Sequence, residues 1–266
     1  MPYISRAQRT HRRRGTDFPG APDLATFQDA SAPITATVKS FLMNDPLNRW
    51  SEQHALLMSL GIGGALLEKS TLLVAAMAAG SFFGLLIRGR GRFTESGRFG
   101  LANGITLAWV LGAVGLLLVA DANPGWLAGL VALLVGAKGL AGWAAQGCGM
   151  GSAFSRLFEQ EGDAFLLLVA CLLLFSSGRF GGWILLPGAL PYGFMLLRQV
   201  ARPPLSAAWG DYSSRTLGVM ATLGFAACLL PIMPASAALW LALAISSALA
   251  GSFVYALAFL YRSKRA

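Results

Sequence analysis

Long apolar runs alternate with short polar segments over most of the chain. Crossing a bilayer as a helix takes about 20 residues, and several of the runs approach or exceed that length. The main runs occupy residues 101–120, 124–137, 163–177, 182–197, 216–233 and 237–261. The second run is short, but Ala141, Gly142 and Ala145 allow its helix to continue. The pattern predicts an all-α fold, a polytopic membrane helix bundle with six core transmembrane helices.

Residues 54–87 add two apolar stretches, separated by Glu68 and Lys69. If they crossed the membrane once, the arginine-rich N-terminus would lie opposite the other basic segments. A hairpin that turns at 68–70 keeps it on the same side, and a re-entrant or interfacial first arm would serve equally well. We therefore expect an N-terminal hairpin in addition to the six core helices.

The segment before this hairpin, residues 44–53, places Arg49 and Trp50 among polar groups, which is typical of an interfacial helix. Residues 1–40 contain five arginines and too few apolar residues for a core, so we expect a mobile cytoplasmic tail. The sequence thus predicts three regions. They are a basic tail over 1–43, an interfacial helix and hairpin over 44–98, and a six-helix membrane domain over 99–266.

The composition agrees with a membrane protein, since 55% of the 266 residues are hydrophobic and only 12% are charged. An ordinary soluble domain is about one quarter charged. The net charge of +9 comes largely from Arg and Lys placed beside apolar runs, and these residues concentrate in alternate loops. One set of loops holds Arg88, Arg90, Arg92 and Arg98, then Lys138 and Arg156, then Arg198, Arg202 and Arg215, then Arg262, Lys264 and Arg265, whereas the other set holds only Arg179.

This asymmetry predicts an integral protein of a bacterial inner membrane, with both termini in the cytoplasm. It explains the basic charge without nucleic acid, which we do not expect as a partner. Three scattered cysteines and two histidines, His11 and His54, lack the spacing of metal ligands, so no metal or other cofactor is expected.

One cytoplasmic segment combines groups with chemical potential. Lys138 precedes a glycine-rich stretch, and Arg156, Glu159 and Asp163 follow it. Glu159 and Asp163 are four residues apart and so share a helix face. Glycines allow close approach of a ligand phosphate, although tight helix packing would also explain them. We read the two acids as opening the third core span, where Asp163 would lie at a helix start and pair with Lys138 or Arg156. Lys138 would either pair with an acid or extend from the end of its span toward the membrane surface.

The spacing of this segment resembles the CDP-alcohol phosphotransferases, whose motif is Asp-x-x-Asp-Gly-x-x-Ala-Arg, eight residues, then Gly-x-x-x-Asp-x-x-x-Asp. The ungapped motif falls on Lys138, Ala141, Gly142, Ala145, Gln146, Ser155, Glu159 and Asp163. Gly142, Ala145 and Asp163 match, Glu159 is conservative and the other four positions differ. Asn103 and Thr106 are similar to that family's Asn-x-x-Thr segment, with Trp109 where a basic residue often stands, and the resemblance covers roughly 99–262.

The resemblance implies a six-helix fold, a homodimer and transfer of a phospho-alcohol from a CDP-linked donor. In that family the first three acids hold divalent metal and the last is the base. Here Lys138 and Ala141 replace two metal acids, and hard cations need oxygen ligands. Asp163 remains as a candidate base, whereas Lys138, Arg156 and Arg215 form a candidate phosphate-binding set.

The leading hypothesis is a catalytically lapsed homologue that binds a phospholipid or CDP-linked ligand, or a membrane-protein partner. One alternative is an active phosphatidyltransferase-type enzyme of phospholipid biosynthesis with an altered mechanism. A transporter or unrelated assembly factor is a third reading, but polar groups within the spans are too scarce to favour it.

Overall fold

The computed structural model describes residues 46–68, 70–94, 96–148, 152–201 and 211–262. Within these ranges, the side chains of 141–148, 198–201, 211–215 and 259–262 are not described. The predicted tail over 1–43 lies outside the described residues.

All regular structure in the described residues is helical, so the predicted all-α class is confirmed. The elements are α2 (Pro46–Glu68), α3 (Leu72–Arg88), α4 (Gly100–Leu118), α5 (Pro124–Cys148), α6 (Ala153–Ser176), the 3₁₀-helix η1 (Gly182–Ile184), α7 (Leu185–Ala201), α8 (Asp211–Leu229) and α9 (Ala235–Arg262). Each predicted core run overlaps one of the helices α4 to α9, although the runs 101–120, 163–177 and 216–233 extend past the ends of their helices and the run 182–197 begins in η1. Within the described chain, Gly100–Leu118 and Ala235–Ala258 are long and apolar enough to cross a membrane, so crossing by all six helices stays a prediction.

Residues 54–87 include most of α2 and nearly all of α3, and these two helices pack against each other. The structure differs from the prediction of a separate interfacial helix over 44–53, because α2 runs unbroken from Pro46. Trp50 is 2% exposed, and its Nε1 donates a hydrogen bond to Ser81 O at 2.8 Å. The ring packs against Phe82 of α3 and the indole N–H is hydrogen-bonded to α3, so this segment is part of the hairpin.

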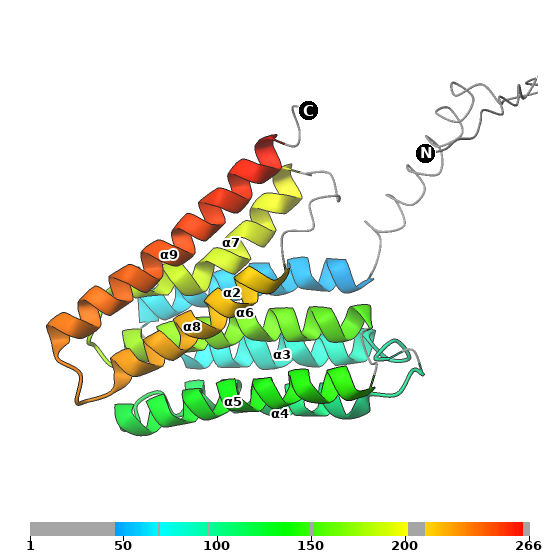
Figure 1. Cartoon of the computed structure of the whole chain (residues 1–266), viewed down its shortest axis with the longest axis horizontal. Coiled ribbons are helices and arrows are strands. Elements are labelled where there is room, and N and C mark those ends of the chain that lie inside the picture. Colours follow the sequence, from blue (N-terminus) through cyan, green and yellow to red (C-terminus); the bar gives the residue numbers. More distant parts are fainter. Residues whose placement is uncertain (1–45, 69, 95, 149–151, 202–210, 263–266) are drawn as a thin grey trace, which may run out of the picture. The chain divides into compact units, whose positions relative to one another are not determined.

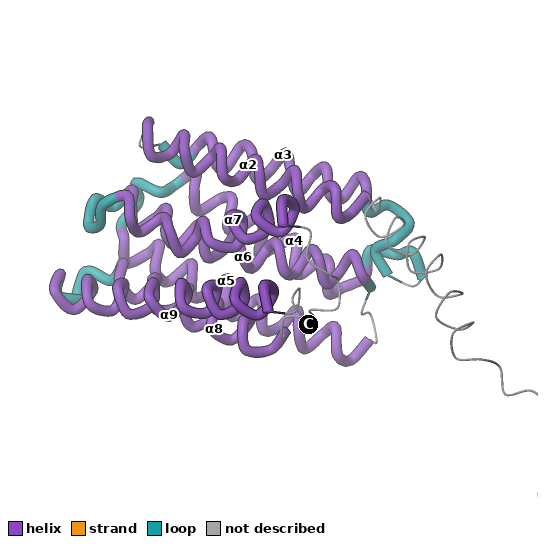
Figure 2. The backbone as a smooth tube through the Cα atoms, turned by 90° about the horizontal axis from the view of Figure 1, so that it is seen from above, coloured by secondary structure: helices purple, strands orange, loops and turns teal. Residues whose placement is uncertain are grey.

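Helix α6 lies at the centre of the bundle. It packs against α4, α7 and α8 and also touches α2 (Figures 1 and 2). Every residue from Phe165 to Leu174 is buried. A helix that is apolar on all sides requires neighbours on all sides, and these contacts supply them.

The start of α6 also positions the loop between α3 and α4. Ser152 is the N-cap, where its Oγ accepts a hydrogen bond from Ser155 N at 3.0 Å and donates one to Phe93 O at 2.7 Å. Gly91 and Gly97 have φ values of 79° and 75°, which only glycine adopts readily, so this loop can turn back tightly. The arginine-rich loop 89–99 is therefore held against the first turn of α6, at one end of the bundle.

Arg179, the exception in the charge count, has a structural role at the opposite end. Its guanidinium donates hydrogen bonds to Cys228 O at 2.7 Å, Leu230 O at 3.0 Å and Met233 O at 2.8 Å. These carbonyls lie at the C-terminal end of α8 and in the turn to α9, where backbone oxygens lack helical partners. Arg179 therefore caps α8 rather than setting topology alone.

Close packing of α6 against α7 depends on Gly188. A Cβ atom at this position would lie 2.9 Å from Leu168 Cα and 3.3 Å from Cys171 Sγ. We expect Gly188→Ala to lower the free energy of unfolding by about 1–3 kcal/mol, because backbone would have to move. Gly193→Ala, also in α7, is the matched control, since nothing lies within 4 Å of its added Cβ.

Gly193→Ala should leave the free energy of unfolding unchanged or raise it by up to about 1 kcal/mol, because alanine favours helix over glycine. Denaturant titration in detergent micelles, followed by circular dichroism, measures the free energy of unfolding of both variants. Equal stabilities of the two variants would contradict the close packing.

Candidate binding site

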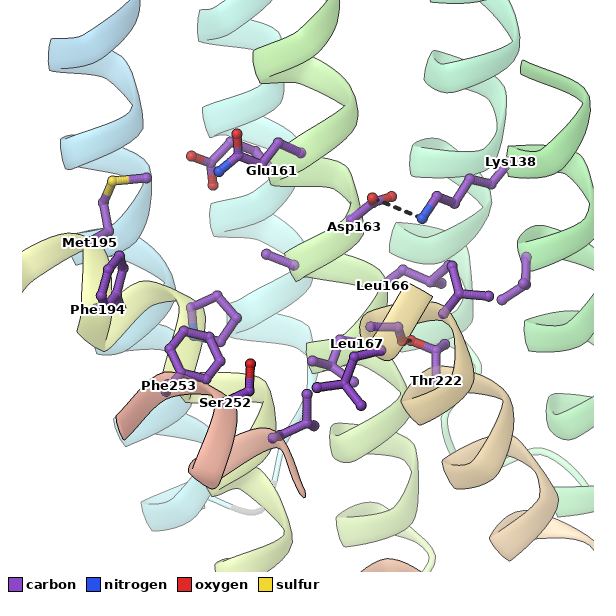
Figure 3. A pocket seen from close by; sticks show the side chains of 18 residues that line it. Lys138, Glu161, Asp163, Leu166, Leu167, Phe194, Met195, Thr222, Ser252 and Phe253 are labelled. Carbon is purple, nitrogen blue, oxygen red and sulfur yellow. Dashed lines mark hydrogen bonds and ion pairs between the residues drawn. The ribbon is translucent and has the colours of Figure 1, made fainter. Parts of the chain in front are cut away.

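A cavity of about 190 Å³ lies between the last five helices, α5 to α9. Its walls are mostly apolar and include Leu167, Leu217 and Leu249 together with the rings of Phe194 and Phe253 (Figure 3). Its polar and charged lining residues are Lys138, Gln160, Glu161, Asp163, Thr222 and Ser252. A small number of polar groups in an apolar cavity is the usual construction of a ligand site.

Lys138 of α5 and Asp163 of α6 form an ion pair in this cavity. The Nζ to Oδ2 distance is 2.8 Å, and the side chains are 12% and 20% exposed (Figure 3). Among the pairings left open by the sequence, Lys138 with Asp163 is the one observed. Because both groups are mostly removed from water, this pair is much more strongly coupled than a surface salt bridge.

The predicted location of Asp163 at a helix start is wrong. Helix α6 begins at Ala153, and the cap at Ser152 explains why. At a rise of about 1.5 Å per residue, Asp163 lies about 15 Å further along the axis. Lys138 is likewise inside α5, which continues to Cys148, so it does not mark the end of its helix. The ion pair therefore lies between the interior parts of α5 and α6 and not at the end of either helix.

The structure does not bring the other candidate residues into the cavity with Lys138 and Asp163. Arg156 is exposed and Glu159 is half-buried on α6, and neither is among the described residues that line the cavity. Gly142 and Ala145 lie in α5 and Arg215 lies in α8, but their side chains are outside the described set.

Glu161, which the sequence analysis did not single out, is the third ionisable group of the cavity. It is 3% exposed, and one of its oxygens, Oε1, accepts a hydrogen bond from Ser51 Oγ of α2. The same hydroxyl lies 3.7 Å from Met195 Sδ. Glu161 therefore connects the cavity to the N-terminal hairpin. The sequence alone gives little reason to choose Glu161, because Glu159 and Asp163 are acids in the same short stretch.

Further polar groups lie in the core beside Ser51. His54 Nδ1 is 2.8 Å from Ser81 Oγ, and its ring stacks on Trp50 with centroids 4.9 Å apart. Within the described part of the chain, His54 Nε2 and Tyr192 Oη lack hydrogen-bond partners. His54 is thus a buried member of the hairpin core.

In the Asn-x-x-Thr segment, Asn103 ties α4 to the loop before it, whereas Thr106 bonds within α4. Asn103 Nδ2 donates to Phe99 O at 2.6 Å and Phe93 O at 3.2 Å, and Thr106 Oγ1 donates to Ala102 O at 3.0 Å. Trp109 is 1% exposed, and a Cβ added to Gly162 would lie 2.5 Å from its Cη2 atom. This close approach fixes the α6 segment that carries Glu161 and Asp163.

The residues present do not fit a divalent metal of the kind that the sequence resemblance implies. Lys138 brings an ammonium group to the first ligand position, where it bonds to Asp163. Ala141 offers no side-chain oxygen, and hard cations need several. Among the described residues, no three His, Cys, Asp or Glu side chains are grouped as ligands would be.

The fold and site define a helical protein with an amphipathic internal cavity and two helices suited to crossing a membrane. Compared with protein-family models, curated proteins and solved structures, the chain matches none of them.

Proposed function

We propose that the chain is an integral membrane homologue of the CDP-alcohol phosphotransferases that has lost the metal-dependent transfer and binds a phosphate-bearing lipid. In this proposal α4 to α9 are the six core spans, α2 and α3 add a membrane hairpin, and the arginine-rich end faces the cytoplasm of a bacterial cell.

The observation that carries the proposal is the Lys138–Asp163 pair on the wall of an apolar cavity. An ammonium group is a competent point charge for phosphate. Asp163 holds it in place while the cavity is empty of ligand, and a lipid phosphate would then share the ammonium with Asp163.

The size of the cavity suits part of a lipid. Sites for drug-sized ligands are commonly about 300–1,000 Å³, and this cavity is about 190 Å³. It has room for a head group and the first methylene groups, so the acyl chains would continue along the apolar helix surfaces into the bilayer. Exposed apolar side chains on α9, Trp240 and Val254 among them, provide such a surface.

The test is the phospholipid content of the purified protein, measured by phosphorus assay and mass spectrometry with and without EDTA. We expect near-stoichiometric lipid that EDTA does not remove. The double variant Lys138→Met/Asp163→Leu replaces the pair as a unit and should reduce retained lipid about tenfold, the order expected for losing one charged hydrogen bond.

Arg90→Gln is the matched control, because it also removes a positive charge but lies on the exposed loop between α3 and α4. It should retain lipid like the unaltered protein. Equal lipid content in the double variant and the control would reject the proposal.

An active transferase is the second candidate, and the observation in its favour is that Asp163 lines the cavity. It predicts release of CMP from CDP-diacylglycerol or another CDP-alcohol, dependent on magnesium and abolished by Asp163→Asn. Such release would replace the binding proposal, whereas lipid retention without CMP release supports it.

A further inference from the structure

Glu161 is a buried carboxylate on the wall of the proposed lipid cavity. It is 3% exposed, and Ser51 supplies a hydrogen bond to one of its oxygens. In the described part of the chain, no Lys, Arg or His nitrogen forms an ion pair with it. A carboxylate removed from water is costly unless an opposite charge accompanies it.

The cavity itself has a charge imbalance. Lys138 is neutralised by Asp163 at 2.8 Å, so ionisation of Glu161 would leave one negative charge uncompensated, and burial opposes it unless a positive group is supplied. A ligand that brings only a phosphate would add a second negative charge beside it. A ligand that also brings a positive group would compensate Glu161.

The two acids stand on opposite flanks of the α6 surface that faces the cavity. With about 100° between successive residues, Gln160, Ala164 and Leu167 form the middle of this face. Glu161 lies to one side of them, toward Met195 of α7, and Asp163 lies to the other side with Lys138 (Figure 3). Ala164 is small, so a head group that crosses it would have Lys138 at one end and Glu161 at the other.

We infer that this cavity selects a phospholipid whose head group carries a primary ammonium, with the phosphate on Lys138 and the ammonium on Glu161. The inference rests on the proposed lipid-binding function and adds the head-group class to it. A primary ammonium donates three hydrogen bonds to carboxylate oxygens, whereas a quaternary ammonium has no N–H to donate. A head group without nitrogen offers Glu161 no positive charge.

The test incorporates the full-length protein into vesicles with equal amounts of phosphatidylethanolamine, phosphatidylcholine and phosphatidylglycerol. After gentle extraction, mass spectrometry measures which lipids remain with the protein. Phosphatidylethanolamine should be enriched about tenfold over the other two, the order of a charged hydrogen bond. Glu161→Gln should abolish this enrichment with little change in total retained phosphate.

Glu159→Gln is the matched control, since it makes the same change on the same helix at a residue outside the cavity lining. It should keep the enrichment. Ser51→Ala is a second variant, which removes the internal donor to Glu161 and should increase the enrichment.

Equal retention of the three lipids by the unaltered protein, together with high total phosphate, would overturn the inference and leave lipid binding intact. Unchanged enrichment in Glu161→Gln would also overturn it. If Glu161→Gln does not fold, unchanged or reduced enrichment in Ser51→Ala decides against it. No retained phosphate at all would overturn both the inference and the proposed function.

Discussion

Lys138→Met on its own should lower the free energy of unfolding by about 3–5 kcal/mol. The substitution removes the ammonium group 2.8 Å from Asp163 and leaves that carboxylate in a mostly buried position without it. Removing one partner of a buried ion pair typically has a cost of this size. Denaturant titration in micelles, followed by far-ultraviolet circular dichroism, measures the change.

The double variant Lys138→Met/Asp163→Leu separates the pair from its components. Replacing both partners with apolar groups of similar size is often neutral or stabilising, so this variant should unfold within about 1 kcal/mol of the unaltered protein. Additive losses from the two single variants would contradict a coupled pair and would place each charge in its own hydrated environment.

Arg179→Met is expected to have the second largest effect, a loss of about 2–4 kcal/mol. The substitution removes the hydrogen bonds to Cys228 O, Leu230 O and Met233 O, each within 3.0 Å. Bonds from a charged donor contribute about 1.5–3 kcal/mol each, and water at this end of the bundle replaces part of that contribution.

Arg179→Lys should have an intermediate effect, since an ammonium group cannot match the fixed fork of donors. Arg90→Met, on the exposed loop, is the control with no expected change. Hydrogen exchange of the turn between α8 and α9 provides a local measurement. Unaltered protection of that turn in Arg179→Met would show that the cap is not needed.

The helices could be predicted from the sequence because a long apolar run must be removed from water, and a helix satisfies its backbone hydrogen bonds while it is buried. The run 163–177 illustrates the limit of this reasoning, since it begins ten residues after the helix that contains it. Helix α6 starts where Ser152 caps it, and its first turns carry only the spaced apolar residues Phe154, Leu157 and Phe158, which do not form a continuous apolar run. The available indication of this helix start in the sequence was Ser152, because serine is a common N-cap residue.

The sequence could predict the ion pair only as one of several pairings. Charged residues are rare in this apolar chain, so Lys138 had few acids to pair with, among them Glu159 and Asp163. The choice of Asp163 required the tertiary fold, which brings Lys138 of α5 within 2.8 Å of Asp163 on α6. Glu161 could not be distinguished from its acidic neighbours, because its burial depends on α2, over 90 residues earlier in the chain, bringing Ser51 to it. Similarly, Trp50 belongs to the core only because Ser81 lies opposite it.

The contacts of α2 constrain the order in which the chain can assemble during synthesis. The hairpin can satisfy His54 and Trp50 by itself, because Ser81 belongs to α3. Ser51 gains its Glu161 partner only after α6 has been made, and the surface of α2 that packs on α7 must wait until residues 185–201 have emerged. A newly made hairpin therefore carries an unfinished polar face for 73 residues of further synthesis, from Arg88 to Glu161, which makes it the segment most in need of protection before the bundle closes.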